Sequence, residues 1–158
     1  MQVKRLLVAT DLSERSDRAF DRAIRMARKF QAKLTVLHVV EGDLPPLIAE
    51  AQAEASLRNL EEQLASISDA ADLEVDLSVV FGKDWSEILK QAEAARSDLI
   101  ILGLHREVGL DGLFRGTTVE RVIRKGDRPV LVVKDRAVRD YRNVVVGMDF
   151  SLNSRRAI

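Results

Sequence analysis

Five short runs of apolar residues recur along the chain, and longer segments with a helical period separate them. The runs cover residues 6–9, 34–40, 75–80, 99–102 and 130–133. Nearly continuous branched residues are typical of strands that are covered on both faces, as in parallel sheets. The third run alternates and places Asp76 and Ser78 on one face, which predicts a strand at a sheet edge.

The segments between the runs carry apolar residues at helical spacing. The four stripes are Ala19, Phe20, Ala23, Ile24, Ala27 and Phe30; Ile48, Ala51, Ala55, Leu60, Leu64 and Ile67; Trp85, Ile88, Leu89, Ala92 and Ala95; and Val119, Val122 and Ile123. Asp84 with Glu87, and Thr117 with Glu120, have capping-box spacing, which predicts the starts of the third and fourth helices. The fourth helix is expected to end near Gly126.

This alternation of strands and helices predicts an α/β fold with one five-stranded parallel sheet. Right-handed crossovers place the helices on both faces, and five strands suggest the flavodoxin-like order 3-2-1-4-5. Ligands of such sheets bind beyond the carboxyl ends of the strands, where the strand order reverses. The candidate site is therefore formed by the loops after the first and fourth strands, residues 10–13 and 103–116.

Composition narrows the function classes. The 158 residues include 25 Lys+Arg and 25 Asp+Glu, a balance that argues against a nucleic-acid partner. Arg18, Arg22, Arg25 and Lys29 share a helix face with Asp17 and Asp21, which predicts a solvated surface. The absence of cysteine excludes disulfides, thiolate zinc sites and cysteine nucleophiles, and two histidines exclude a multi-histidine metal cluster. No apolar run suggests a signal peptide or a membrane span, so we expect a cytoplasmic protein without a membrane partner.

Half of the eight glycines lie between positions 103 and 116, in the loop that could carry chemistry. Gly116 and Thr117 stand where a helix should begin, so their amides would favour an anion such as phosphate. A plain linking loop with an N-cap threonine explains the pattern equally well. Asp11 could accept hydrogen bonds from ribose hydroxyls or cap the helix that follows it. A Walker P-loop and a dinucleotide fingerprint are both absent.

The histidines and the tryptophan have ordinary interpretations. His38 lies in a predicted buried strand and is expected to be a core histidine with satisfied hydrogen bonds. His105 lies in the glycine loop and could touch a nucleotide, but the spacing shows no nucleophile triad. Trp85 is expected to anchor the third helix in the core.

The end of the chain repeats its beginning. Residues 4–20 align without gaps with residues 142–158. Val8, Asp11, Ser13, Ser16, Arg18 and Ala19 recur as Val146, Asp149, Ser151, Ser154, Arg156 and Ala157. The repeat predicts a domain over residues 1–137, and then, over 138–158, a linker and the truncated start of a second such domain. We expect this second start to be disordered unless it adds to another chain or to a sheet edge, because its valines lack a sheet of their own.

Several of these motifs together resemble the universal stress protein family. They are the Thr-Asp-x-Ser at 10–13, the Leu-His-Val at 37–39, the Gly…Gly-Thr loop before Val-Glu-Arg-Val-Ile at 119–123, and the Arg-Pro-Val-Leu-Val-Val at 128–133. The resemblance covers residues 3–134. The family's nucleotide-binding branch has Gly-x-x-Gly, nine residues, then Gly-Ser/Thr around ATP.

The resemblance implies roles for residues at the matching positions. Gly103, Gly116 and Thr117 match the phosphate and ribose contacts, Asp11 the ribose-side aspartate, and Val39 the residue whose backbone meets adenine. The candidate nucleotide-binding residues are Thr10, Asp11, Val39, Gly103, His105, Arg106, Gly116, Thr117 and Thr118. The implied cofactor is ATP, with Mg²⁺ or Mn²⁺ bridging its phosphates.

One position departs from the motif, because Arg106 stands where the second glycine should be. Its guanidinium could pair with phosphate oxygens, or it could fill the pocket and block the ligand. The first hypothesis is a cytoplasmic stress-response regulator that binds an adenine nucleotide without turning over a substrate. The alternative is a dimerisation or interaction module that does not bind nucleotide, and a slow ATPase ranks third. We also expect a homodimer through strand 130–133 and a protein partner that the sequence does not identify.

Overall fold

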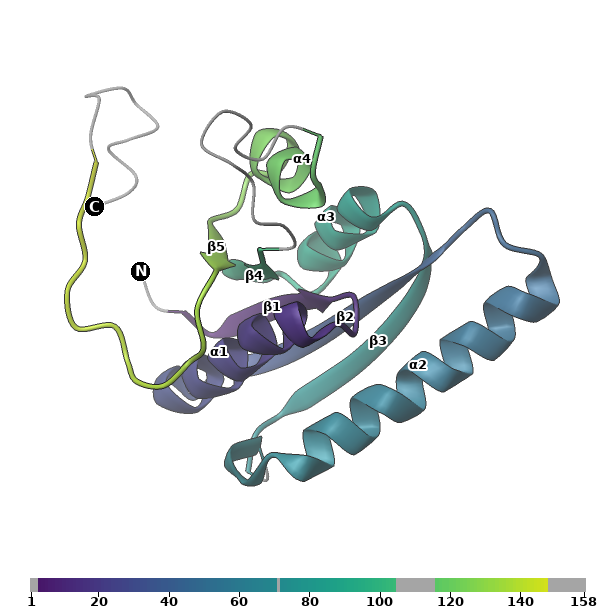
Figure 1. Cartoon of the computed structure of the whole chain (residues 1–158). Helices are drawn as coiled ribbons and strands as arrows, with labels where there is room; N and C mark the ends of the chain where they lie inside the picture. The colour runs from purple at the N-terminus through teal and green to yellow at the C-terminus, as the bar shows by residue number, and fades with distance from the viewer. Residues whose placement is uncertain (1–2, 71, 105–115, 148–158) are drawn as a thin grey trace.

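The computed structural model describes residues 3–70, 72–104 and 116–147, in which strands and helices alternate (Figure 1). The strands are β1 (Arg5–Thr10), β2 (Lys33–Glu41), β3 (Val75–Gly82), β4 (Leu99–Gly103) and β5 (Val130–Val133). The helices are α1 (Glu14–Phe30), α2 (Pro46–Ser66), α3 (Asp84–Ala94) and α4 (Thr118–Lys125), with a short 3-10 helix at Ser68–Ala70. Each of the five apolar runs is therefore a strand, as predicted.

The strands form one parallel sheet in the order β3-β2-β1-β4-β5, which confirms the predicted topology. Val8 at the centre of β1 pairs with Val36 of β2 on one side and with Ile101 of β4 on the other. The polar residues Asp76 and Ser78 do lie on an edge strand, β3. The carboxyl ends of β1 and β4 are adjacent at the point where the order reverses, so their loops meet at one edge of the sheet.

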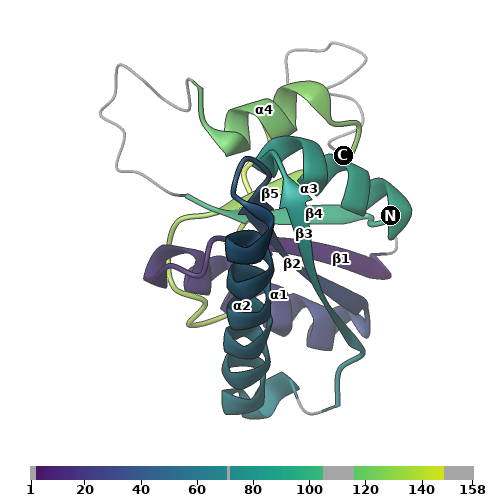
Figure 2. The same ribbon diagram turned by 90° about the vertical axis from the view of Figure 1, so that its right-hand side faces the viewer.

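Helices cover both faces of the sheet, and each face has its own core (Figure 2). Leu6 and Val8 pack against Phe20 of α1 and Leu60 of α2, whereas Leu7 points the other way, into the core of α3 and α4. This alternation follows from the two-residue period of a strand. Burial of each such side chain stabilises the fold by about 1.5–3 kcal/mol.

The predicted apolar stripe of α2 is only partly correct. Ile48 remains 55% exposed, and Ala51 and Ala55 are also exposed, whereas Leu60 is fully buried. The face toward the sheet instead carries Ala49 and Ser56 in the first half of the helix. These small residues leave no apolar signal in the sequence.

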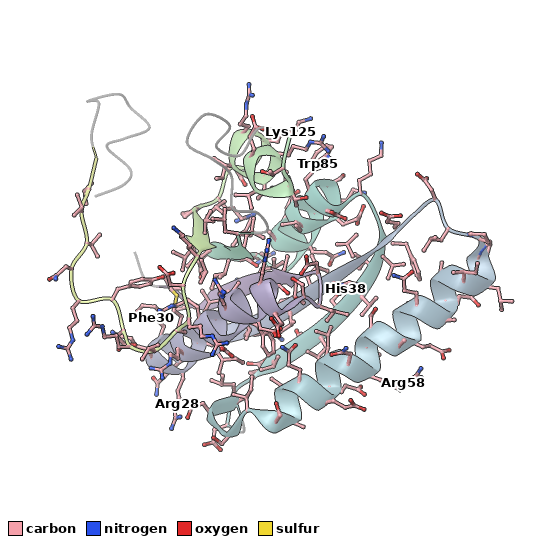
Figure 3. The ribbon with its side chains drawn as sticks, viewed as in Figure 1. Arg28, Phe30, His38, Arg58, Trp85 and Lys125 are labelled. Atoms are coloured by element: carbon pink, nitrogen blue, oxygen red, sulfur yellow. The ribbon has the colours of Figure 1, made fainter. Side chains whose placement is uncertain are left out.

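The apolar stripes predicted for α1 and α4 each include one residue too many at the end of the helix. Phe30 at the last residue of α1 is 44% exposed, and Ile123 near the end of α4 is 50% exposed. Both lie in the last turns of their helices, shortly before the chain enters the next strand. Trp85 packs against the α3–α4 core as expected, and the Lys125 ammonium lies 4.3 Å from the centroid of its ring (Figure 3).

The two predicted capping boxes have different outcomes. Thr117 is the N-cap of α4, and its hydroxyl accepts from the amide of Glu120 at 3.2 Å. The helix ends at Lys125 with Gly126 as its C-cap, as predicted. The prediction for α3 is wrong, because Asp84 is already the first helical residue and no side chain caps the helix. The Glu87 carboxylate instead accepts from Lys90, at 2.6 Å.

The chain after β5 has no helix or strand through residue 147. Val144 and Val145, which align with strand residues in the predicted repeat, are 79% and 96% exposed. Residues 148–158 lie outside the described residues, so the second domain start and its ordering stay predictions. Among the described helices, none is long and apolar enough to cross a membrane.

Candidate functional site

A cleft of about 520 Å³ opens at the carboxyl ends of β1, β2 and β4. It lies where the strand order reverses, as the topology predicts. Its lining comes from the loop after β1, the first turn of α1, the end of β2 and the start of α4. Seven of the nine candidate residues line it, namely Thr10, Asp11, Val39, Gly103, Gly116, Thr117 and Thr118. The other two, His105 and Arg106, lie outside the described residues.

Thr10 lines the cleft and is held by several hydrogen bonds. Its hydroxyl lies 2.8 Å from the Ser16 hydroxyl and accepts from the Leu12 amide at 3.0 Å. Its carbonyl oxygen lies 2.9 Å from Nδ1 of His38. His38 is buried, and this bond confirms the prediction of a satisfied core histidine (Figure 3). Thr10 is itself only 6% exposed, so its first role is to fix the turn between β1 and α1.

Asp11 lies on the rim of the cleft and orients the residue that caps α1. Its carboxylate accepts from the Ser13 amide at 3.1 Å and from the Ser13 hydroxyl at 2.6 Å. Ser13, not Asp11, is the N-cap of α1, and Leu12 between them has a positive φ of 61°. The alternative that Asp11 caps the helix directly is therefore wrong. A carboxylate can accept further hydrogen bonds, so this arrangement leaves a ligand contact chemically possible.

The glycine at the end of β4 is required by packing. A Cβ atom on Gly103 would lie 3.2 Å from both the Arg15 carbonyl oxygen and the Ser16 Cα. Both contacts are with the backbone of the first turn of α1, which cannot swing away. Gly103 therefore allows the end of β4 to approach the first turn of α1 closely, beside the cleft that both line.

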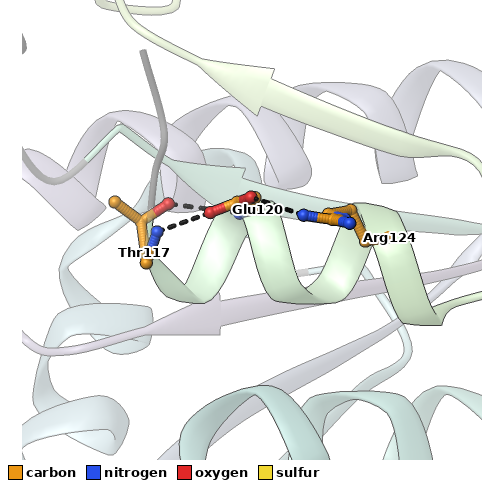
Figure 4. Close-up of polar contacts among 4 residues, drawn as sticks. Thr117, Glu120 and Arg124 are labelled. Atoms are coloured by element: carbon orange, nitrogen blue, oxygen red, sulfur yellow. Dashed lines mark hydrogen bonds and ion pairs between the residues drawn. The ribbon is translucent and has the colours of Figure 1, made fainter. Parts of the chain in front are cut away.

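The start of α4 supplies main-chain donors, and Glu120 already engages one of them (Figure 4). The Gly116 amide, at a residue with φ of 76°, donates to Oε2 of Glu120. The other oxygen of Glu120 pairs with Arg124 at 3.2 Å. An anion that binds this amide must displace a carboxylate of the chain itself. On the adjoining rim, the Thr118 hydroxyl donates to Asp84 at 3.4 Å.

The structure adds cleft residues that the sequence analysis did not identify: Arg15, Glu41 and Asp84. Glu41 ends β2 and Asp84 opens α3, so both follow from the rule that loops at the carboxyl edge meet. Leu37, Val39 and Leu102 give the same cleft an apolar part of its lining. The described residues contain no group of three or more histidine, cysteine or acidic side chains arranged to hold a metal ion.

The sequence model of the universal stress protein family matches residues 2–134. The chain belongs to this family. Universal stress protein MJ0531 of Methanocaldococcus jannaschii is 31% identical over 141 residues, which cover 83% of this chain and 82% of the relative. The resemblance inferred from the motifs is thus confirmed over nearly the same residues.

Solved structures agree with this family assignment. The structure of MJ0577 from the same archaeon superposes with a TM-score of 0.67 at 26% identity and covers 87% of this chain and 99% of that one. A universal stress protein in complex with cAMP gives a TM-score of 0.69 at 24% identity, covering 85% and 98%. At that identity, the second likeness concerns the fold alone.

Proposed function

We propose that the cleft binds an adenine nucleotide and that the protein is a cytoplasmic regulator of the stress response. The observation that carries this proposal is the convergence of seven candidate residues, chosen from sequence, around one cleft. The cleft lining combines apolar side chains with hydroxyl and amide groups, which is the lining expected for a ligand with a flat base and a polar end.

The lining suggests an orientation for the nucleotide. The base would lie against Val39, the ribose near Asp11, and the phosphates near Gly103, Gly116 and Thr117. Helix N-termini favour phosphate, and Glu120 would have to release the Gly116 amide for it to bind. The universal stress protein crystallised with cAMP supports an adenine nucleotide as the ligand class for this fold.

We further propose ATP as the nucleotide, with Mg²⁺ or Mn²⁺. The carboxylates of Asp11, Glu41 and Asp84 line the cleft beside a single basic residue, Arg15, among the described residues. A polyphosphate would meet repulsion there, and a divalent cation on the phosphates would reduce it. Oxygen ligands of this type suit either metal. The cation would be held mainly by phosphate oxygens, because the described residues offer no complete cage.

Calorimetric titration with ATP and magnesium tests the proposal directly. We expect wild type to bind, and Asp11→Ala to weaken binding about tenfold through the loss of charged hydrogen bonds. Asp43→Ala, in an exposed loop, is the matched control and should bind like wild type. Because Asp11 also orients the cap of α1, circular dichroism of each variant must first match wild type.

Arg106→Gly separates the two function hypotheses. If wild type and the glycine variant both bind, the nucleotide hypothesis stands. If only the glycine variant binds, Arg106 blocks the cleft and the protein is an interaction module. If neither binds, the proposed role of the cleft is wrong. Glu120 at the Gly116 amide is the observation that favours the module hypothesis, because the chain already satisfies that donor.

A regulator also needs a means of association. We propose that two chains pair through β5, which is an edge strand of the described sheet, and that residues 138–158 begin a second domain. Slow ATP hydrolysis stays the third hypothesis, behind regulation and association.

A further inference from the structure

The outer face of α1 is in contact with the chain that follows β5. Residues 134–141, here named the strap, pass along this helix (Figure 1). Nη1 of Arg18 donates to the Lys134 carbonyl oxygen at 2.8 Å, and Nη1 of Arg22 donates to the Arg139 carbonyl oxygen at 2.9 Å. Further along the helix, the Lys29 ammonium pairs with an Asp140 oxygen at 2.9 Å.

The contacts follow the same order along both segments. From Arg18 to Lys29 the helix rises about 16 Å, at about 1.5 Å per residue. The strap is not extended over this length, because the Val138 amide donates to the Arg136 carbonyl oxygen at 2.9 Å in a tight turn. It therefore follows α1 with a bend, and its contacts keep the order of the helix residues.

Arg22 is the centre of this interface. The sequence predicts a solvated face here, but Arg22 is only 6% exposed, so that prediction is wrong for this residue. Its guanidinium carbon lies 4.3 Å from the centroid of the Tyr141 ring, and the described residues give its Nε no hydrogen-bond acceptor. A desolvated guanidinium under an aromatic ring gains more from the cation–π contact than an exposed one.

The strap also contributes an apolar anchor and complementary charge. Ala137, in its middle, is 8% exposed, although its neighbours on both sides are exposed. The Lys29 ammonium holds the pKa of Asp140 below its usual value. The bonds from Arg18 and Arg22 to main-chain oxygens attach the strap to α1. The side chains of Asp140 and Tyr141 fix which residues of the strap face which residues of the helix.

We propose that the basic face of α1 is a docking surface whose occupant is the chain's own strap. Docking fixes the point, beside α1, from which residues 142 onward depart, and it covers cationic groups that would otherwise be open to polyanions. The proposal stands on the strap contacts alone and does not depend on nucleotide binding.

Limited proteolysis with trypsin of the full chain tests the docking. The Arg136–Ala137 bond lies within the strap, and cleavage there requires the strap to leave α1. Mass spectrometry measures its rate in the protein and in a peptide of residues 134–147, which sets the undocked limit. We expect slower cleavage in the protein, and an acceleration of about fivefold in Tyr141→Leu, as for loss of a partly desolvated cation–π contact.

Arg22→Gln should accelerate the same cleavage, and its combination with Tyr141→Leu should add little, because both remove one contact. Arg58→Gln is the control, since Arg58 lies on α2 and its closest charged partner is Glu54 at 3.7 Å. If Arg22→Gln alters the circular dichroism, Tyr141→Leu alone decides, because Tyr141 is half exposed. Equal rates in protein and peptide, or no acceleration in Tyr141→Leu, would overturn the proposal.

Discussion

At the scale of single residues, the polar groups around the cleft serve the chain before they serve a ligand. Thr10 ties the end of β1 to Ser16 and to His38, and Asp11 orients Ser13 at the cap of α1. Each of these bonds fixes a group that lines the cleft, so a ligand would meet a preorganised site. Such a site loses less entropy on binding than one whose side chains must first be ordered.

Asp21 on α1 provides a test of the electrostatics beside the strap. Although it lies at the surface, partial desolvation raises the pKa of its carboxyl group above the usual 3.8, and the charge of Asp17 raises it further. At pH 7 this carboxylate therefore lowers the stability of the folded protein, because its charged form is less favourable there than in the unfolded chain. We expect Asp21→Asn to raise the melting temperature at pH 7, by up to about 2 °C for a solvent-screened group.

The advantage of Asp21→Asn should shrink as pH falls through the raised pKa, because wild type then becomes neutral at this position too. Thermal melts of both proteins between pH 7 and pH 3 measure this. Asp43→Asn, in an exposed loop, serves as the control. An advantage that stays constant down to pH 3 would show that charge is not its cause.

At the scale of elements, strands were predicted more accurately than helix faces. The branched runs and the polar Asp76 are signals within a few residues of one strand, and they fix both the strands and the edge position of β3. Helix faces depend on distant partners. The buried Arg22 contacts Tyr141, which lies far away in the sequence, and the buried face of α2 carries small residues that periodicity does not detect.

The contact between α3 and α4 yields a prediction at the same scale. A Cβ atom on Gly126 would lie 2.7 Å from the Val122 carbonyl oxygen and 2.8 Å from Cδ2 of Leu89 on α3. Gly126→Ala should therefore destabilise the protein by about 1–3 kcal/mol, the usual cost of overpacking. Urea unfolding followed by the fluorescence of Trp85, the one tryptophan of the sequence, measures it.

Gly147→Ala is the matched control, because nothing lies within 4 Å of the added atom. It should unfold at the urea concentration of wild type. If Gly126→Ala unfolded there as well, the packing of α4 on α3 would be looser than the distances indicate.

At the scale of the whole molecule, the cleft and the strap share α1. The first turn of this helix lines the cleft, and the residues from Arg18 to Lys29 hold the strap. The position of the cleft followed from the sequence, because topology alone locates the carboxyl ends of β1 and β4. The hydrogen bond from the Gly116 amide to Glu120 could not be predicted from the sequence. The spacing of Gly116, Thr117 and Glu120 is typical both of a helix cap and of a phosphate site.

The proposed dimer depends on the open edge of β5. Pro129 and Val133 direct their carbonyl oxygens toward β4, so the two-residue period of a strand turns the backbone groups of Val132 outward. Val132→Pro removes an outward amide without removing a bond to β4, and proline is tolerated on edge strands. We expect wild type to sediment as a dimer at micromolar concentration and Val132→Pro as a monomer.

Val132→Thr keeps the amide and the branched shape, so it should remain dimeric. A wild-type monomer at high micromolar concentration, or a dimeric proline variant, would show that this edge is not the interface.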